Sequence, residues 1–359
     1  MINICFYLAG FVQGGTARSV SIIGNELQKN PEYNVTALCH SSQGKKDIYK
    51  TDFKITYLYE KRISVGKAIL KDNYIKKVSK YVKDNNINIL IVCDELFYPP
   101  AIIAGRKIKV LCWLHTSPFV KSDYRFQKTV KNFGFTFSDG IIVLSKYTEK
   151  IVRKSFKNKP IYQIYNPLDD ALFYQDVNYK PDTKKIISVG RLSYPKNFDR
   201  VVSLTCNIKQ RFPELQWHIY GEGEERKHLE ELIAKANLKK TVILMGQHSD
   251  IYSCYGDYSV IVNTSRYEGF PMTLIEAASC GLPMISFDIQ TGPSEIIMDG
   301  QNGYLCENNN ETQMTERIIE LLSDRNSRIS MSEKSRKTAL EYKLATIIAK
   351  WNNMFRDYL

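Results

Sequence analysis

Two segments in the second half of the sequence combine cations, carboxylates and glycines in a way that suits a phosphorylated, hydroxylated ligand. In the first, GRLSYPKN, the turn residue Gly190 is followed by Arg191 and Lys196. A guanidinium offers a planar pair of donors and an ammonium offers a compact charge, so together they suit a diphosphate. Two solvated surface cations are the plainer alternative, and this segment alone does not decide between them.

The second segment, SRYEGFPMTLIEAASCGLP, carries Glu268 and Glu276 with seven residues between them. Carboxylates accept hydrogen bonds from paired hydroxyl groups, so a sugar or a ribose is a suitable partner. The glycine and proline within 269–271 let backbone N–H groups approach a ligand, and residues 272–278 have the pattern of a helix that follows. Two glutamates at an arbitrary spacing more often decorate a surface helix, but the surrounding residues favour a ligand site.

Both segments follow short apolar runs that alternate with helical patterns along the whole chain. The predicted strands are 2–8, 35–39, 87–93, 110–115 and 140–144 in the first half and 185–189, 217–220, 242–245, 258–263 and 284–287 in the second. Segments 17–28 and 67–84 have the apolar spacing of helices. This alternation predicts an α/β fold with parallel sheets, in which ligands bind at the carboxyl ends of strands.

The length of 359 residues predicts two domains rather than one. We expect two Rossmann-like, doubly wound lobes that face each other across a cleft. A polar linker at 166–181 would separate a lobe at 1–165 from a lobe at 182–328, and residues 329–359 predict a terminal helix that packs back towards the first lobe.

The composition, with 43% hydrophobic and 25% charged residues, indicates a packed globular protein. The eight cysteines are scattered without a C-x-x-C pair, so reduced thiols are expected rather than disulfides or a zinc site. The sequence starts with a strand-like run that lacks a basic leader, and no apolar run approaches the roughly 20 residues of a membrane-spanning helix. We therefore expect a cytoplasmic protein without a signal peptide or a membrane span.

The positive charge of the chain lies entirely in its first half. Residues 1–180 hold 28 Lys and Arg against 15 Asp and Glu, a net charge of +13, whereas residues 181–359 hold 22 against 23, a net charge of −1. A basic lobe predicts an anionic partner, with nucleic acid, anionic lipid and a phosphorylated substrate as the candidates. No nucleic-acid recognition module is present, so no nucleic-acid partner is expected.

Taken together, the motifs resemble the donor lobe of the family 4 retaining glycosyltransferases, which have the GT-B fold. The resemblance rests on GRLSYPKN, GEGEE at 221–225, EGFPMTLIE, and GLP followed by TGPSEII at 291–297, and it covers most of residues 182–306. It implies transfer of a sugar from a nucleotide diphosphate with retention at the anomeric carbon. GEGEE lacks the first-strand position and the ribose acid of a dinucleotide-binding fold, so an NAD enzyme is not expected.

The resemblance also implies roles for single residues. Arg191 and Lys196 would bind the donor diphosphate, Glu268 would contact the transferred sugar and be catalytic, and Glu276 would bind the ribose. Backbone amides of 269–271 would hold the sugar hydroxyls, and the segment with Gln247 would frame the base. The full expected donor-binding set is Gly190, Arg191, Lys196, Gln247, Gly269, Phe270, Pro271, Met272, Thr273, Leu274 and Glu276.

The first half adds two weaker elements. Gln13, Gly14 and Gly15 follow the first predicted strand, and Arg18 lies one turn into the next helix, so this loop is expected to hold a phosphate or the acceptor, although a glycine pair is more often only a turn. His115 ends a predicted strand and matches the family's cleft histidine, which makes it the second expected catalytic residue. A lone histidine is more often structural.

The sequence contains no D-x-D triplet, so ligands for a metal-bridged donor are not expected. Arg191, Lys196 and helix N-termini must then stabilise the leaving diphosphate, and activity without a metal or other cofactor is predicted. The alternatives are a catalytically silent partner subunit that binds nucleotide sugar or lipid, and a sucrose-type synthase or an epimerase on the same fold.

Two segments of the basic half suit more than one anionic partner. Residues 67–84 form an amphipathic pattern that a core-packing helix explains slightly better than a binding surface. Residues 119–137 mix Phe and Tyr with Lys and Arg, which suits an anionic bilayer as well as the lining of a cleft. By resemblance we expect a UDP-hexose or UDP-N-acetylhexosamine donor, a saccharide acceptor carried on a lipid diphosphate, and a peripheral location on the inner membrane face in surface polysaccharide synthesis.

Overall fold

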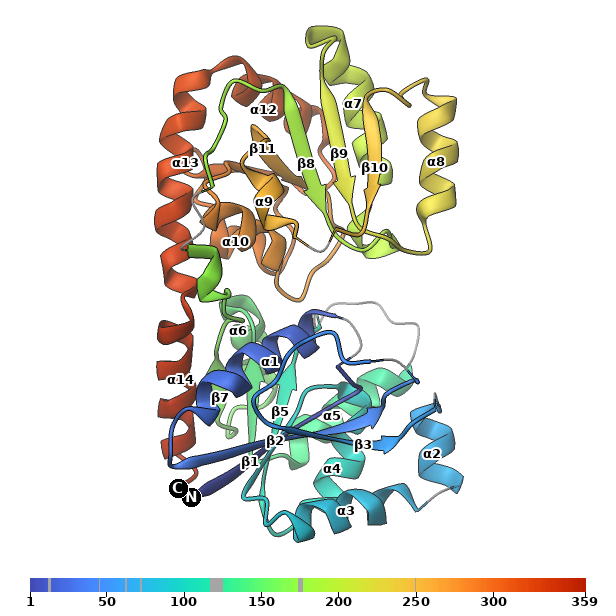
Figure 1. Cartoon of the computed structure of the whole chain (residues 1–359), viewed down its shortest axis with the longest axis vertical. Coiled ribbons are helices and arrows are strands. Elements are labelled where there is room, and N and C mark those ends of the chain that lie inside the picture. Colours follow the sequence, from blue (N-terminus) through green and yellow to red (C-terminus); the bar gives the residue numbers. More distant parts are fainter. Residues whose placement is uncertain are drawn as a thin grey trace. The chain divides into compact units, whose positions relative to one another are not determined.

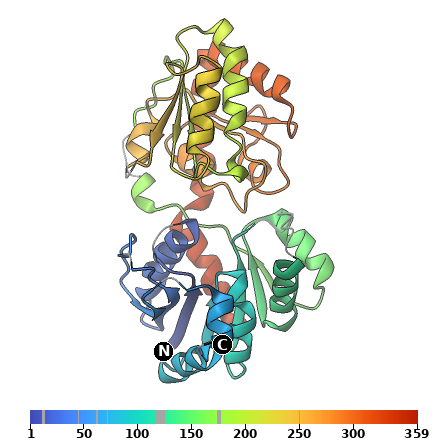
Figure 2. The ribbon, with the colours of Figure 1, turned by 90° about the vertical axis from the view of Figure 1, so that its right-hand side faces the viewer.

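The computed structural model describes residues 1–11, 14–44, 46–61, 63–71, 73–116, 125–173, 177–248 and 250–359. The chain divides into two compact units: unit 1 comprises Met1–Pro167 and Leu344–Leu359, and unit 2 comprises Leu168–Lys343. Each unit is a parallel sheet with helices on both of its faces (Figure 1, Figure 2). The predicted α/β class with two doubly wound lobes is confirmed.

Among its described residues, unit 1 has a seven-stranded sheet in the order β3-β2-β1-β4-β5-β6-β7. The strands are β1 (Ile2–Leu8), β2 (Tyr33–Ser41), β3 (Lys54–Tyr59), β4 (Ile89–Val92), β5 (Lys109–Leu114), β6 (Gly140–Val143) and β7 (Ile161–Gln163). The helices are α1 (Gly15–Gln28), α2 (Val65–Lys71), α3 (Tyr74–Asp84), α4 (Tyr98–Ala104), α5 (Arg125–Phe137), α6 (Lys146–Ser155) and α14 (Leu344–Arg356). The strand order reverses between β1 and β4, and ligands bind at the carboxyl ends of strands at such a point.

Unit 2 has a six-stranded sheet among its described residues, in the order β10-β9-β8-β11-β12-β13. The strands are β8 (Lys185–Val189), β9 (Gln216–Tyr220), β10 (Val242–Gly246), β11 (Val260–Asn263), β12 (Met284–Phe287) and β13 (Gly303–Cys306). The helices are α7 (Asp199–Arg211), α8 (Arg226–Lys235), α9 (Tyr252–Tyr255), α10 (Met272–Ser279), α11 (Pro293–Ile296), α12 (Glu311–Ser323) and α13 (Arg325–Ala339). Here the order reverses between β8 and β11, the two strands that precede the candidate segments.

Three strands were not expected from the sequence, and all of them lie at sheet edges. They are β3 and β7 in unit 1 and β13 in unit 2. Every residue of β3 is at least partly exposed, and β7 is only three residues long. An edge strand buries less apolar surface than a central strand, so it lacks the continuous apolar run by which the inner strands were found.

The polar stretch 166–181 differs from the expected linker. The chain divides after Pro167, and the described residues of 168–181 belong to unit 2. Tyr179 Oη donates a hydrogen bond of 2.7 Å to the carbonyl of Ser259, next to β11. The stretch is partly buried and hydrogen-bonded by residues that are distant in sequence. Its polar composition therefore gave no sign that it belongs to unit 2.

The terminal segment is two helices rather than the single one expected. Although no glycine or proline marks a break, α13 ends at Ala339 and α14 begins at Leu344. The helices belong to different units. Trp351 of α14 is fully buried in unit 1, with its ring 4.9 Å from that of Trp113 and 6.0 Å from that of Phe6. The terminal segment is therefore divided into two helices because each helix packs in the core of a different unit, and not because a residue with low helix propensity interrupts it.

The eight cysteines are all free thiols, and six of them are buried. Burial raises the pKa of Cys5 to about 12, so this thiol stays protonated and unreactive. Within the ranges that the structure describes, no helix is both long enough and apolar enough to span a bilayer.

Candidate functional site

The loops that follow β8 and β11 meet at the reversal point of the unit 2 sheet. Lys196, from the first loop, and Glu268, from the second, lie side by side, with 2.5 Å between Nζ and Oε1. The loops are also joined through the hydroxyl of Thr264, which donates to the carbonyl of Lys196 at 3.0 Å. The structure thus brings together two predicted site residues that lie 72 positions apart, at the place where this type of sheet binds ligands.

The carboxylate of Glu268 is held in one orientation. Besides Lys196, it accepts a hydrogen bond of 2.6 Å from Ser265 Oγ, and its side chain is only 10% exposed. Its backbone carbonyl accepts a bond of 2.5 Å from Thr291 Oγ1 in the TGPSEII segment. A carboxylate fixed by several partners is preorganised, so it can orient a sugar hydroxyl without first losing side-chain freedom.

Arg191, the other residue expected to bind the diphosphate, has an acidic partner of its own. Its guanidinium pairs with Glu224 of the GEGEE segment, with 3.0 Å between Nη2 and Oε2. The Arg191 side chain is 73% exposed, and exposed ion pairs contribute little to stability. Diphosphate binding by Arg191 stays a prediction, and it would require this exposed ion pair to open. The sequence did not indicate this partner, because no spacing rule links the two segments.

Glycines allow the loops after β8 and β9 to lie backbone against backbone. Gly221 has a φ of 140°, and a Cβ there would collide with the carbonyl oxygen of Gly190. The Gly190 N–H in turn donates to the carbonyl of Tyr220 at 2.9 Å. A Cβ on Gly190 would come within 3.0 Å of Cε of Lys196, so this glycine leaves room for the lysine stem. The two glycines therefore allow the loops to approach each other and leave room for the side chain of Lys196.

The segment from Gly269 to Leu274 was expected to bind the donor, and the side chains of two of its residues point into the core. Phe270 and Leu274 are buried, and the ring of Phe270 packs 5.8 Å from that of Tyr342. Pro271 has no N–H, so the expectation that backbone amides of all of 269–271 hold a sugar must be corrected to exclude it. In the first turn of α10, the Met272 N–H donates to the carbonyl of Phe270 at 3.0 Å and the Leu274 N–H to that of Pro271 at 3.0 Å, so the loop before the helix takes up part of the donors of the helix start.

Glu276 and Gln247 stay predictions as contacts to the nucleoside. Glu276 lies in α10, is 4% exposed and accepts a hydrogen bond of 3.2 Å from Tyr252 Oη. A buried carboxylate is stable only with hydrogen-bonding partners, which suits a group that also takes ribose hydroxyls. Gln247 is exposed directly after β10, beside Gly246, whose φ of 75° turns the chain at the strand end.

The residues expected from the first half lie at the carboxyl edge of the unit 1 sheet. Gly14, with a φ of 125°, is the N-cap of α1, and Gly15 is the first residue of that helix. Arg18 is half-buried in the same first turn, and its N–H donates to the carbonyl of Gly14 at 3.2 Å. Gln13 lies outside the described residues. The phosphate or acceptor role of this loop stays a prediction.

His115 directly follows β5, at the same edge of the sheet. Its ring lies 4.1 Å from that of Trp113, and burial lowers its pKa to about 3, so the imidazole is neutral at physiological pH. Its Nε2 is buried and has no hydrogen-bond partner among the described residues. A neutral imidazole with an unpaired nitrogen is suited to bind a substrate hydroxyl. The following residues at 117–124, which include the first part of the aromatic and basic stretch 119–137, lie outside the described part of the chain.

A further acidic residue at this edge was missed by the sequence analysis. Asp94 follows β4 at the reversal point of the unit 1 sheet. Burial raises its pKa to about 6, the charge of Glu95 adds to the rise, and a hydrogen bond from the backbone of Ala9 opposes it. Perturbed carboxyl groups gather at functional sites, so Asp94 is a candidate for acceptor binding. The only sequence signal was a pair of acids directly after an apolar strand.

The raised pKa of Asp94 predicts a pH-dependent stability. The folded state favours the neutral carboxyl, so the stabilisation is complete below the ordinary pKa of 3.8 and is lost as pH rises through about 6. Asp94→Asn is therefore expected to raise the free energy of unfolding by about 1–3 kcal/mol at pH 8 and to change it little at pH 4. Urea denaturation at both pH values measures this, with the exposed Asp84→Asn as control. An equal gain at the two pH values would contradict the assignment.

Within the described ranges, one group of side chains has an arrangement that a metal ion could use. It consists of Asp199, Glu225 and His228, near the starts of α7 and α8, with 3.2 Å between His228 Nε2 and Asp199 Oδ2. The group is largely accessible to solvent. Exposed acidic groups commonly cluster without an ion, so this trio alone assigns no metal site.

Two family models match the chain, one on each side of the division. The model described as Glycosyltransferase Family 4 matches residues 13–172, and the model described as Glycosyl transferases group 1 matches residues 172–338. The chain belongs to the family 4 glycosyltransferases. Its two doubly wound units are the lobes of the GT-B fold, and both the fold class and the family resemblance expected from the sequence are confirmed.

Relatives and a solved structure agree with this assignment. An uncharacterized glycosyltransferase of Haemophilus influenzae is 28% identical over 361 residues, which cover 99% of this chain and 100% of that protein. The poly(ribitol-phosphate) alpha-N-acetylglucosaminyltransferase of Staphylococcus aureus is 30% identical over 313 residues, 82% of this chain and 61% of that enzyme. The crystal structure of Anabaena Alr3699/HepE in complex with UDP superimposes with a TM-score of 0.80 at 16% identity and covers 99% of this chain and 100% of that one.

Proposed function

We propose that this glycosyltransferase moves a hexose or an N-acetylhexosamine from a UDP-sugar to a saccharide acceptor, with retention of configuration. The observation that carries the proposal is the contact of Lys196 with Glu268 at the reversal point of the unit 2 sheet. This contact puts a cation suited to a diphosphate next to a carboxylate suited to a sugar hydroxyl. In a nucleotide sugar the diphosphate and the sugar are likewise adjacent. The UDP complex of a protein with the same fold supports the choice of nucleotide.

Retention is supported by the name of a relative. The Staphylococcus aureus relative is named an alpha-N-acetylglucosaminyltransferase, and an alpha-linked product made from an alpha-linked UDP-sugar is one of retained configuration. Same-face substitution needs stabilisation of the leaving diphosphate more than it needs a protein nucleophile. Lys196, Arg191 and the N-terminus of α10 supply positive charge for this, and Glu268 positions the sugar. No step requires a metal ion.

The acceptor in this proposal is a saccharide, carried on a lipid diphosphate and destined for a surface polysaccharide. The net charge of +13 in residues 1–180 suits both an acceptor diphosphate and an anionic membrane surface. His115 and Asp94, at the carboxyl edge of the basic unit, supply groups that can bind its hydroxyls. The enzyme would then work as a peripheral protein on the inner face of the membrane.

A nucleotide panel tests the donor site. UDP is expected to raise the melting temperature more than GDP, ADP or TDP, because one base pocket serves one nucleotide, and the shift is expected to be lost in Arg191→Ala with Lys196→Ala. EDTA is expected to leave the UDP shift unchanged, and Asp199→Ala with His228→Ala, which removes the possible metal group, serves as a second control.

The outcomes of the panel separate the alternatives. Dependence of the UDP shift on a divalent ion would contradict metal-independent binding. Equal shifts from all four nucleotides would contradict the choice of UDP. UDP binding without any UDP release from UDP-sugars in the presence of acceptor-bearing membranes would instead favour a catalytically silent partner subunit.

A further inference from the structure

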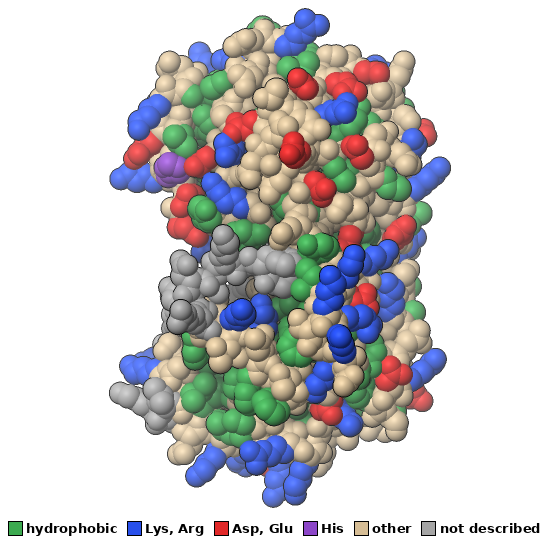
Figure 3. Space-filling view, turned by 180° about the vertical axis from the view of Figure 1, so that it is seen from behind, with side chains coloured by type: hydrophobic (Ala, Val, Ile, Leu, Met, Phe, Trp, Pro, Cys, Tyr) green, Lys and Arg blue, Asp and Glu red, His purple; other side chains and the backbone are tan. Residues whose placement is uncertain are grey.

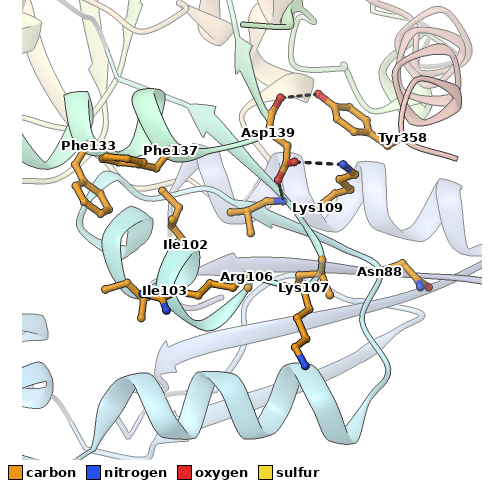
Figure 4. Close-up of a pocket in the computed structure, with 13 residues that line it drawn as sticks. Asn88, Ile102, Ile103, Arg106, Lys107, Lys109, Phe133, Phe137, Asp139 and Tyr358 are labelled. Atoms are coloured by element: carbon orange, nitrogen blue, oxygen red, sulfur yellow. Dashed lines mark hydrogen bonds and ion pairs between the residues drawn. The ribbon is translucent and has the colours of Figure 1, made fainter.

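A pocket of about 840 Å³ lies in unit 1, at the amino ends of the strands of its sheet. Gly14 and His115 lie at the opposite, carboxyl ends. The pocket opens beside the amino end of β5 and is bordered by the last turns of α4 and α5 (Figure 4). Ile102 and Ile103 of α4 form one part of its apolar wall, and Phe133 and Phe137 of α5 form another. The pocket belongs to neither the donor segments nor the loops at the carboxyl edge, so glycosyl transfer does not account for it.

The apolar wall continues as an exposed stripe along α5. Phe126, Phe133 and Phe137 are spaced by seven and four residues, so they lie along one side of the helix. Phe126 is 66% exposed and Phe137 60%, and the rings of Phe133 and Phe137 are 4.7 Å apart. Figure 3 shows hydrophobic side chains exposed on the unit 1 part of the molecule, with Lys and Arg side chains nearby. Two exposed phenylalanines in line with the partly exposed Phe133 indicate an interaction surface.

The sequence that spans α4 and α5 is mainly basic. Residues 98–137 contain seven Lys and Arg and a single acid, Asp123. At the pocket, Asp139 lies 3.4 Å from Lys109 and accepts a bond from the Val110 N–H (Figure 4). Arg106 and Lys107 are exposed at the pocket, and neither has an acidic partner among the described residues. The pocket therefore joins an apolar wall to two unneutralised cations.

We propose that the α4–α5 face, formed by Ile102, Ile103, Arg106, Lys107, Phe126, Phe133 and Phe137, docks on an anionic bilayer and receives the head group of one anionic phospholipid in its pocket. Phenylalanines enter the boundary between head groups and acyl chains, and the cations pair with lipid phosphates. This inference rests on the proposed membrane association and assigns the surface responsible for it.

The direction of α5 makes this docking compatible with catalysis. The helix runs back from the carboxyl edge of the sheet, where β5 ends, to the amino edge, where β6 starts at Gly140. With α5 lying along the membrane, both edges of the unit 1 sheet are next to the bilayer. His115 at the carboxyl edge then lies where a lipid-carried acceptor is presented.

Vesicle flotation of the full chain tests the cations. The wild type is expected to float with phosphatidylcholine vesicles that contain phosphatidylglycerol and not with pure phosphatidylcholine. Arg106→Gln with Lys107→Gln is expected to lower the partition coefficient roughly 25-fold, because each cation at an anionic surface contributes about fivefold. The matched control, Lys154→Gln with Lys157→Gln, removes the same charge from exposed positions in and after α6 and is expected to retain binding within about twofold. Equal losses in the two variants would overturn the proposal.

A fluorescent reporter tests which surface meets the lipid. The three native tryptophans are fully buried, so an added one dominates any response to vesicles. Phe137→Trp is expected to shift its emission to the blue with anionic vesicles and to be shielded from a water-soluble quencher. Tyr147→Trp, at a 39% exposed site on α6, is expected to show neither change. A response from the Tyr147 position and none from the Phe137 position would place the membrane elsewhere.

Measurements on the wild type and the same variants also test for other occupants of the pocket. If glycerol phosphate or inorganic phosphate binds the pocket and vesicles do not, the site serves a soluble anion and the proposal is wrong. If size-exclusion chromatography shows a dimer that Phe137→Ser dissociates and no vesicle binding occurs, the occupant is a second copy. The UDP-induced melting shift is expected to persist in every variant of this face, so failure of docking is separable from failure of the donor site.

Discussion

Glu268→Gln and Lys196→Ala are each expected to lower the rate of UDP release from the donor sugar by roughly a hundredfold to a thousandfold, the loss typical of removing one preorganised charge from an active site. Glu268→Gln removes the charge that is proposed to orient the sugar, and Lys196→Ala removes the charge that is proposed to stabilise the leaving diphosphate. UDP affinity is expected to fall in Lys196→Ala and to stay close to wild type in Glu268→Gln. Steady-state kinetics and UDP titration measure the two effects.

The controls address folding, because the pair is largely buried and removal of one partner leaves the other unneutralised. The double variant Lys196→Ala with Glu268→Gln is expected to be more stable than Lys196→Ala and equally inactive. Lys180→Ala breaks an exposed ion pair with Asp257 in the same unit and is expected to keep full activity. Near wild-type turnover in Lys196→Ala would remove the main support for the proposed donor site.

Trp351→Ala is expected to lower the free energy of unfolding of unit 1 by about 3–5 kcal/mol, the usual loss for a buried tryptophan. The indole is fully buried between Trp113, Phe6 and Phe355, so truncation leaves a cavity lined by aromatic rings. Denaturant unfolding followed by tryptophan fluorescence and circular dichroism measures the change. Because the donor residues all lie in unit 2, UDP binding at low denaturant is expected to survive.

A matched substitution in the same terminal segment is Leu359→Ala, at a site that is 67% exposed. It is expected to change stability by less than about 0.5 kcal/mol. A loss below about 1 kcal/mol in Trp351→Ala would mean that α14 is not an integral part of the unit 1 core. The two results together test whether the end of the chain completes the first lobe.

Docking through the α4–α5 face and transfer at the unit 2 donor site use different residues, so their failures are independent. Loss of vesicle binding in Arg106→Gln with Lys107→Gln is expected to reduce transfer to a membrane-borne acceptor without reducing UDP affinity. The effect of the basic charge on membrane binding would then depend mainly on its position, because Arg106 and Lys107 lie on the α4–α5 face, which also carries exposed phenylalanines.

The sequence by itself determined the features that depend on neighbouring residues. Apolar runs placed the inner strands, because a strand covered on both faces needs an uninterrupted apolar segment. The donor segments were found because their chemistry lies in single strand-to-helix loops, such as the eight residues that begin at Gly190. Family and fold class therefore followed from local sequence, as did the choice of the segments that we propose to bind the donor.

Only the tertiary structure decided what depends on contacts between distant segments. It paired Lys196 with Glu268 and Arg191 with Glu224, because adjacent strand ends bring together loops that no sequence spacing relates. The perturbed pKa of Asp94 and the buried Nε2 of His115, which has no partner in the described part of the chain, depend on burial by other elements, which composition does not reveal. The break between α13 and α14 was also decided by the structure, because their helical patterns are continuous. The sequence did predict that the end of the chain packs towards the first lobe, and the structure shows that Trp351 of α14 is buried there.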